Sequence, residues 1–103
     1  MASNAYISGE SAEGIGYSFE VGNNVTVPGE MISLHSFIKT LENDVSYAVY
    51  FLNGVEIGTG YGIPFTLNID FSPYKGKTLE LSCRAFDSKG AVCADKTYTI
   101  KVQ

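Results

Sequence analysis

The sequence predicts an all-β fold, an immunoglobulin-like antiparallel β-sandwich of about seven strands with an irregular N-terminal arm. Three observations lead to this prediction. Apolar and polar residues alternate along the chain, turn residues interrupt the alternation about every 8–12 residues, and no amphipathic helical stripe of useful length is present. The 103 residues leave room for one domain. We divide it into an arm over residues 1–22 and a sandwich domain over residues 23–103.

The first 22 residues are rich in glycine and serine, a composition typical of a flexible or irregular segment. Pure linkers seldom carry many large apolar residues, yet this segment contains Tyr6, Ile7, Ile15, Tyr17 and Phe19. Two interpretations remain open at this stage. Residues 17–21 form an extra edge strand, or the arm docks on a neighbouring subunit.

The strands expected after the arm are separated by clear turns. The dipeptide Asn53-Gly54 favours a type I′ hairpin, because that turn needs a positive φ at both central residues. A two-residue loop would pair Leu52 with Val55 and Tyr50 with Ile57, on one buried face. The next three glycines, Gly58, Gly60 and Gly62, are expected in a loop. The expected strands cover residues 23–28, 31–39, 46–52, 64–70, 78–86 and 91–102, with a further strand that starts at Val55.

The two cysteines, Cys83 and Cys93, flank an expected four-residue turn over residues 87–90. Such a turn pairs Phe86 with Ala91 and places the two thiols on opposite faces of the sheet. We therefore expect reduced thiols, with Cys83 a small core residue. A β-bulge would change this register, so a disulfide stays open as the alternative.

No residue pattern points to catalysis, a cofactor or a metal ion. The only histidine, His35, is expected on the outward face of its strand, without partners for acid–base or zinc chemistry. The alternating glycines at 58, 60 and 62 are followed by a strand, whereas a phosphate loop needs a helix N-terminus. The carboxylates lie mostly at turns. We therefore expect no catalytic, cofactor-binding or metal-binding residues, and a protein that is not an enzyme.

Charge and hydropathy restrict the partners. The net charge is −4, and the six lysines and single arginine are spread along the chain. Nucleic acids and anionic membranes bind clustered basic residues, so neither is an expected partner. The longest apolar run, Ala48–Leu52, is far too short to span a bilayer. The N-terminus has neither a basic start nor an apolar stretch, so we expect no signal peptide.

Large side chains that alternation places outward are candidates for an interface. A protein partner is favoured over carbohydrate, because the chain has no tryptophan. Ordinary sandwich packing and edge cover remain the alternative. With those of the arm, the interface candidates are Tyr6, Ile7, Ile15, Tyr17, Phe19, Tyr47, Phe51, Tyr61 and Tyr74.

The second half of the chain resembles a known family through three segments: residues 50–58 (YFLNGVEIG), 64–66 (PFT) and 79–90 (LELSCRAFDSKG). These are similar to the bacterial Ig-like repeat family, whose modules occur in bacterial surface proteins and are fused to phage structural proteins. The resemblance covers about residues 48–102. It implies an Ig-like fold, and the first half departs from the family pattern.

The resemblance and the composition together predict a non-enzymatic structural or binding module. The first expectation is a small protein that decorates a larger assembly such as a phage capsid, located on a virion that assembles in the host cytoplasm. Its partner would be a protein of that assembly or a second copy of the chain. The alternative is an adhesion, spacer or carbohydrate-binding module of a bacterial surface protein or glycoside hydrolase, at the cell surface or secreted within a larger chain.

Overall fold

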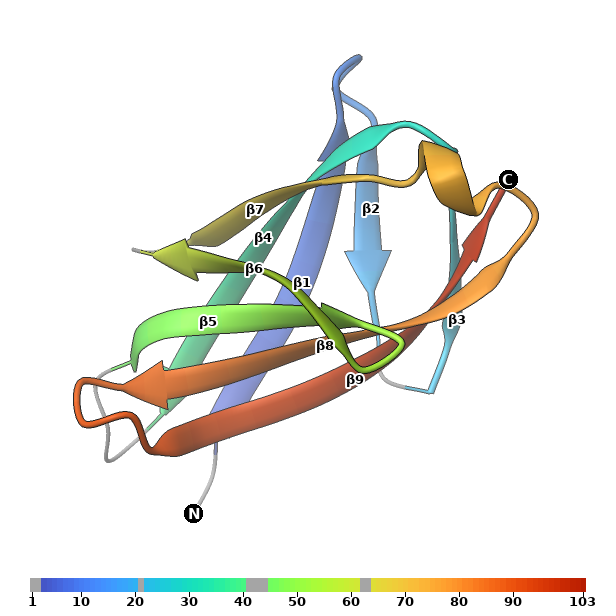
Figure 1. Ribbon diagram of the computed structural model, residues 1–103. Coiled ribbons are helices and arrows are strands. Elements are labelled where there is room, and N and C mark those ends of the chain that lie inside the picture. The colour runs from blue at the N-terminus through green and yellow to red at the C-terminus, as the bar shows by residue number, and fades with distance from the viewer. Residues whose placement is uncertain (1–2, 21, 41–44, 62–63) are drawn as a thin grey trace.

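The structure is a computed structural model that describes residues 3–20, 22–40, 45–61 and 64–103. Two β-sheets pack face to face (Figure 1), one with the strand order β2-β1-β4-β7 and the other with the order β3-β9-β8-β5-β6. The strands are β1 (Ser3–Ser11), β2 (Gly16–Phe19), β3 (Asn24–Val27), β4 (Met31–Thr40), β5 (Val45–Leu52), β6 (Val55–Tyr61), β7 (Phe65–Asp70), β8 (Thr78–Asp87) and β9 (Val92–Val102), with a short 3₁₀ turn at Ser72–Tyr74.

The predicted immunoglobulin-like sandwich is confirmed, and seven of the strands follow residue 23 as expected. One pairing differs from the antiparallel expectation. The short strand β3 runs parallel to the end of β9, from Asn24 opposite Thr99 to Val27 opposite Val102. This pairing closes one edge of the five-stranded sheet.

The N-terminal segment is not an irregular arm where the structure describes it. Strand β1 lies between β2 and β4 and pairs with β4 along its whole length. The glycine-rich composition led to the wrong prediction of an irregular arm, because Gly9 lies in a strand that packs closely on core side chains. A Cβ on Gly9 would lie 3.1 Å from the Ile32 side chain and 3.2 Å from the Phe19 ring, so a larger residue would force these core side chains to shift. The edge strand expected over residues 17–21 is β2, and Val21 lies outside the described residues.

The Asn53-Gly54 turn has the predicted geometry, with φ of 49° and 81° at its two central residues. Leu52 pairs with Val55 as expected. The pairing of Tyr50 with Ile57 was wrong, because a bulge between Tyr50 and Phe51 adds one residue to β6 and places Gly58 opposite Tyr50. Val55, expected on the buried face, is 66% exposed at the end of its strand.

Two of the glycines expected in a loop belong to strand β6, and the third, Gly62, lies outside the described residues. A Cβ on Gly60 would lie 2.9 Å from the carbonyl carbon of Phe65, and one on Gly58 would lie 2.8 Å from the Leu67 side chain. Strand β6 of one sheet therefore approaches β7 of the other sheet at main-chain distance. Glycine is required at position 60 because the neighbouring atoms are backbone and cannot move aside.

A polar contact joins the two sheets inside the core. The Tyr50 hydroxyl, from β5, donates to the carbonyl of Phe65 in β7 at 2.5 Å, and it also forms a hydrogen bond with Ser36 Oγ in β4. Ser36 Oγ lies 3.4 Å from Cys83 Sγ in β8. All four residues are buried. The buried hydroxyls are thus satisfied, as burial of polar groups requires.

We predict that Gly60→Ala lowers the free energy of unfolding by about 1–3 kcal/mol, because the added methyl group overlaps the Phe65 backbone. The control is Gly16→Ala in β2, where no atom lies within 4 Å of the position that the new Cβ would take. That change should stay within about 0.5 kcal/mol. Guanidinium denaturation followed by circular dichroism measures both, and equal midpoints for the two variants would contradict the close approach.

Removal of the Tyr50 hydroxyl should also destabilise the protein. Tyr50→Phe leaves the buried Phe65 carbonyl without this donor, which costs about 1–3 kcal/mol. The matched control is Tyr61→Phe, which removes the same atom from an exposed ring and should change the stability by less than about 0.5 kcal/mol. A Tyr50→Phe protein as stable as the control would show that the hydroxyl does not tie the sheets together.

Stability should fall as the pH rises above about 10. Burial raises the pKa of the Tyr50 hydroxyl far above its ordinary value, and burial likewise raises the pKa of Tyr98 to about 12. In the unfolded chain both hydroxyls lose their protons near pH 10, so above that pH the unfolded state binds fewer protons and the free energy of unfolding decreases. Urea denaturation at about pH 8 and about pH 10.5 measures this loss, and Tyr98→Phe should reduce it.

Candidate binding surfaces

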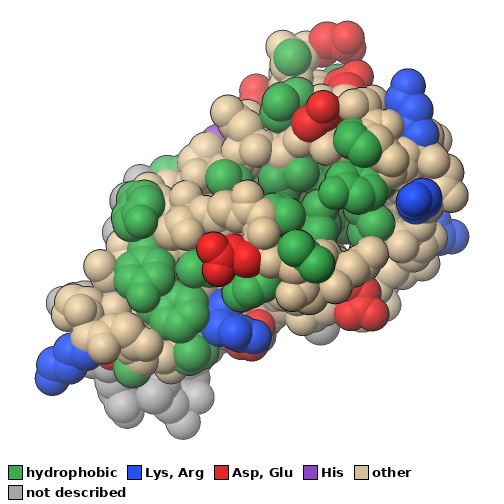
Figure 2. All heavy atoms as spheres, in the orientation of Figure 1, with side chains coloured by type: hydrophobic (Ala, Val, Ile, Leu, Met, Phe, Trp, Pro, Cys, Tyr) green, Lys and Arg blue, Asp and Glu red, His purple; other side chains and the backbone are tan. Residues whose placement is uncertain are grey.

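A row of large side chains crosses the outer face of the five-stranded sheet. Tyr61 of β6 pairs with Tyr47 of β5, Tyr47 pairs with Phe86 of β8, and Phe86 pairs with Val92 of β9. We call these four residues the aromatic row. Figure 2 shows hydrophobic side chains gathered at the left end of this face, where β5, β6, β8 and β9 meet in Figure 1.

The rings of the aromatic row contact one another directly. Tyr47 and Phe86 are stacked, with centroids 5.1 Å apart and an interplanar angle of 14°. Tyr61 lies 6.2 Å from Tyr47 at 42°. Tyr61 is 71% exposed and Val92 is 56% exposed, so the row presents apolar area to solvent at both of its ends. An exposed row of touching apolar side chains is typical of a protein contact surface.

Charged residues border the aromatic row on the same face. The Arg84 guanidinium lies 5.0 Å above the Phe51 ring, and Arg84 Nε donates to Asp95 Oδ2 at 3.1 Å. Both charged side chains are well exposed, so the ion pair contributes little to stability. The ion pair holds Arg84 on the same face as Phe51, whose side chain is half-buried.

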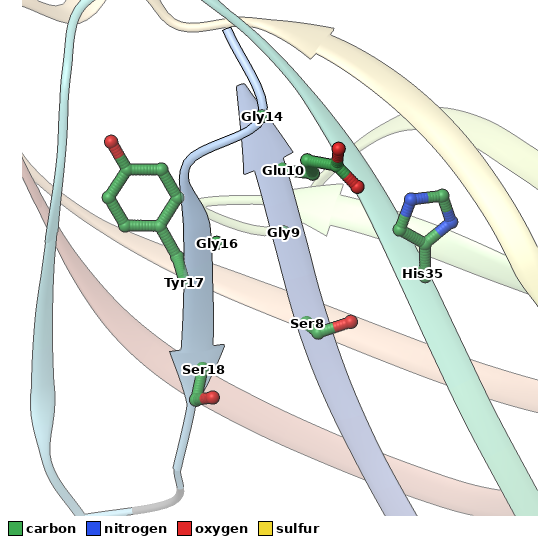
Figure 3. Close-up of a pocket in the computed structure, with 8 residues that line it drawn as sticks. All are labelled: Ser8, Gly9, Glu10, Gly14, Gly16, Tyr17, Ser18 and His35. Carbon is green, nitrogen blue, oxygen red and sulfur yellow. The ribbon is translucent and has the colours of Figure 1, made fainter. Parts of the chain in front are cut away.

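A polar groove lies on the outer face of the opposite sheet. Strands β1, β2 and β4 line a shallow space of about 490 Å³ (Figure 3). His35 faces outward, as predicted, and its Nδ1 forms a hydrogen bond of 2.9 Å with Thr66 Oγ1. The groove was not predicted, because its glycines were attributed to an irregular arm. Its lining residues are Ser8, Gly9, Glu10, Gly14, Gly16, Tyr17, Ser18 and His35.

Several interface candidates have another place in the structure. Ile7 and Phe19 are core residues, 2% and 3% exposed, and are therefore unavailable to a partner. Ile7 was misplaced because residues 1–16 were not expected to form sheet, and Phe19 because the edge strand expected over residues 17–21 was not assigned a buried face. Tyr17 and Tyr74 are half-buried against the core.

Other interface candidates reach the surface. Ile15 is exposed beside the turn between β1 and β2, and Tyr61 is exposed at the end of β6. Tyr47 and Phe51 are half-buried on the outer face of the five-stranded sheet. The backbone of Tyr6 pairs with that of Phe37, and the Tyr6 side chain is not among those that the structure describes. An interface role for the exposed residues stays a prediction.

Both cysteines are free, as predicted, and they lie on opposite faces of the sheet, since Cys83 is buried and Cys93 adjoins the buried Ala94. The expected turn register was wrong. Asp87 pairs with Ala91 around three residues, with Gly90 at a φ of 82°. The next bulge leaves Cys93 unpaired, because Phe86 faces Val92 and Ala85 faces Ala94. Burial raises the pKa of the Cys83 thiol.

The described residues contain no group of three or more His, Cys, Asp or Glu side chains able to hold a metal ion. They also form no helix long and apolar enough to cross a membrane. Asp70 has a pKa below its ordinary value, because its carboxylate accepts the backbone N–H of Ser72, 3.0 Å away. This carboxylate thus stabilises the start of the 3₁₀ turn, a structural task.

No protein-family model and no curated protein matches the sequence. Among solved structures, the chain is similar to the fibronectin(III)-like modules of Clostridium thermocellum CbhA. The TM-score is 0.67 at 18% sequence identity, over 84% of this chain and 93% of that chain. At this identity the likeness shows the fold alone. It supports an immunoglobulin-like β-sandwich fold. No family model supports the more specific resemblance to bacterial Ig-like repeats.

The two thiols should differ sharply in reactivity. Cys93 is half-exposed and should react with a maleimide in the native protein, whereas Cys83 is buried and should react at least about 100-fold more slowly. Intact mass measured over time reports one modification before the second. Cys93→Ser should remove the fast reaction, and two equally fast reactions in the native protein would contradict the burial of Cys83.

Proposed function

We propose that this chain is a non-enzymatic spacer and contact module of a larger bacterial protein. Its fold is that of a fibronectin(III)-like module, a type of domain that is typically non-catalytic. Decoration of a phage capsid, the first expectation from the sequence, gains no support from the comparisons. A location at the bacterial surface or in a secreted chain is therefore the better proposal.

The observation that carries the spacer role is the path of the chain. Strand β1 starts at one end of the molecule and β9 finishes at the other (Figure 1), and the long dimension is 39 Å against 24 Å and 21 Å. A chain that continues in both directions would enter and leave along the long axis. Modules connected in this way separate their neighbours instead of folding back on them.

The aromatic row is the surface we assign to contact with another protein. Tyr47 and Phe86 stack on each other, so one face of each ring is covered by its neighbour, and a sugar packs against an exposed ring face. Tyr61 and Val92 extend the apolar strip across four strands. Aromatic side chains surrounded by polar groups are typical anchors of protein interfaces.

The spacer role predicts an extended tandem arrangement. We would join two copies of the chain through a linker of about four residues and measure small-angle X-ray scattering. We expect a maximum dimension close to twice the 39 Å of one module. A compact particle, with the two modules side by side, would refute the spacer role.

The contact role predicts site-specific cross-linking in the cells that produce the protein. A photoreactive phenylalanine analogue at Tyr61 should give a discrete protein adduct, because this ring is 71% exposed in the aromatic row. The control position is Thr97, which is exposed on the same sheet away from the row. Adducts of equal yield from both positions, or none from Tyr61, would exclude the aromatic row as the contact surface.

A further inference from the structure

We propose that the polar groove on the four-stranded sheet binds a neutral carbohydrate chain. This inference concerns a second surface and does not depend on the aromatic row. The register of strands β1, β2 and β4 brings the lining residues of the groove together. Gly16 of β2 lies opposite Glu10 of β1, and Ser8 of β1 lies between Ser18 of β2 and His35 of β4. The side chains of Ser8, Glu10, Ser18 and His35 therefore share one face of the sheet with the backbone of Gly16.

The glycines open the groove. No atom lies within 4 Å of the Cβ positions of Gly14 and Gly16, so the main chain there is accessible from outside. In Figure 3 the Glu10 carboxylate lies beside the His35 ring, and the Tyr17 ring points away from both. The space of about 490 Å³ is open and shallow, a shape that suits part of an extended ligand.

The polar groups of the groove are available to a ligand. Within the part of the chain that the structure describes, no side-chain hydrogen bond involves Ser8, Glu10 or Ser18. His35 uses Nδ1 for Thr66 and leaves Nε2 without a partner among those residues. Hydroxyl, carboxylate and imidazole groups together both donate and accept, and the hydroxyl groups of a sugar do the same.

Other classes of ligand fit this lining less well. An anion would meet the Glu10 carboxylate and no lysine or arginine, since neither lines the groove. A metal ion needs more ligands than one carboxylate and one imidazole offer. An apolar ligand would leave the hydroxyl groups without water or partner. An extended peptide would pair with the free edge of β2, whereas Ser8, Glu10 and His35 lie on the face of the sheet over β1 and β4.

The test is a titration of the isotope-labelled chain, observed by amide NMR, with four neutral hexasaccharides: cellohexaose, xylohexaose, maltohexaose and mannohexaose. We expect at least one to shift the amides of Ser8, Glu10, Gly16, Ser18 and His35, with a dissociation constant of about 1 mM or tighter. No shift with any of the four at about 10 mM, or shifts confined to the aromatic row, would overturn the proposal.

Two variants assign the binding to the groove. Gly16→Tyr fills the groove from a position with free space, and it should weaken binding at least about tenfold. The matched control, Thr26→Tyr on exposed strand β3, should change the affinity less than about twofold. Glu10→Gln keeps the shape of the side chain and removes its charge. It tests whether the sugar binds in the groove even if Gly16→Tyr disturbs folding, and we expect it to weaken sugar binding about threefold or more.

An octapeptide of alternating threonine and valine tests the competing ligand class. It should leave the groove amides unshifted. Groove shifts with this peptide and not with the sugars, or sugar binding that is equally tight in Gly16→Tyr and Glu10→Gln, would show that the groove is not a carbohydrate site.

Discussion

The buried hydroxyl of Tyr50 is the contact on which the sandwich geometry depends. It comes from the five-stranded sheet, and its partners Ser36 and Phe65 come from the four-stranded sheet. Relative movement of the sheets would leave a buried carbonyl without its donor, at a cost of about 1–3 kcal/mol against a total stability of about 5–15 kcal/mol for a small domain. Phe65 also meets Gly60, so polar and main-chain contacts fix the same place between the sheets.

Once the sheets are fixed, two bulges decide which side chains form the aromatic row. The bulge between β5 and β6 turns Gly58 and Gly60 inward and brings Tyr61 opposite Tyr47. The bulge between β8 and β9 brings Val92 opposite Phe86. A regular ladder would have shifted the partner at each end of the row by one residue and turned its side chain to the other face, since the side-chain period in a strand is two.

The two outer faces of the sandwich therefore differ in chemistry. One carries touching aromatic rings bordered by an ion pair, and the other carries hydroxyl groups, a carboxylate and an imidazole around exposed glycine backbone. We therefore propose a different class of partner for each face.

The sequence by itself determined the β-sandwich, the Asn53-Gly54 turn and the burial of Tyr50, because alternation and turn chemistry are local properties. It also separated the two thiols correctly, although the loop register that supported this was wrong. Tertiary structure decided the roles of the glycines. A glycine gives the same sequence signal in a flexible linker and in a strand that touches the backbone of another sheet, and only the position of Phe65 relative to Gly60 distinguishes the two. The two bulges that place the aromatic row were not visible in the alternation either, because an extra residue in one strand leaves no local sequence signal.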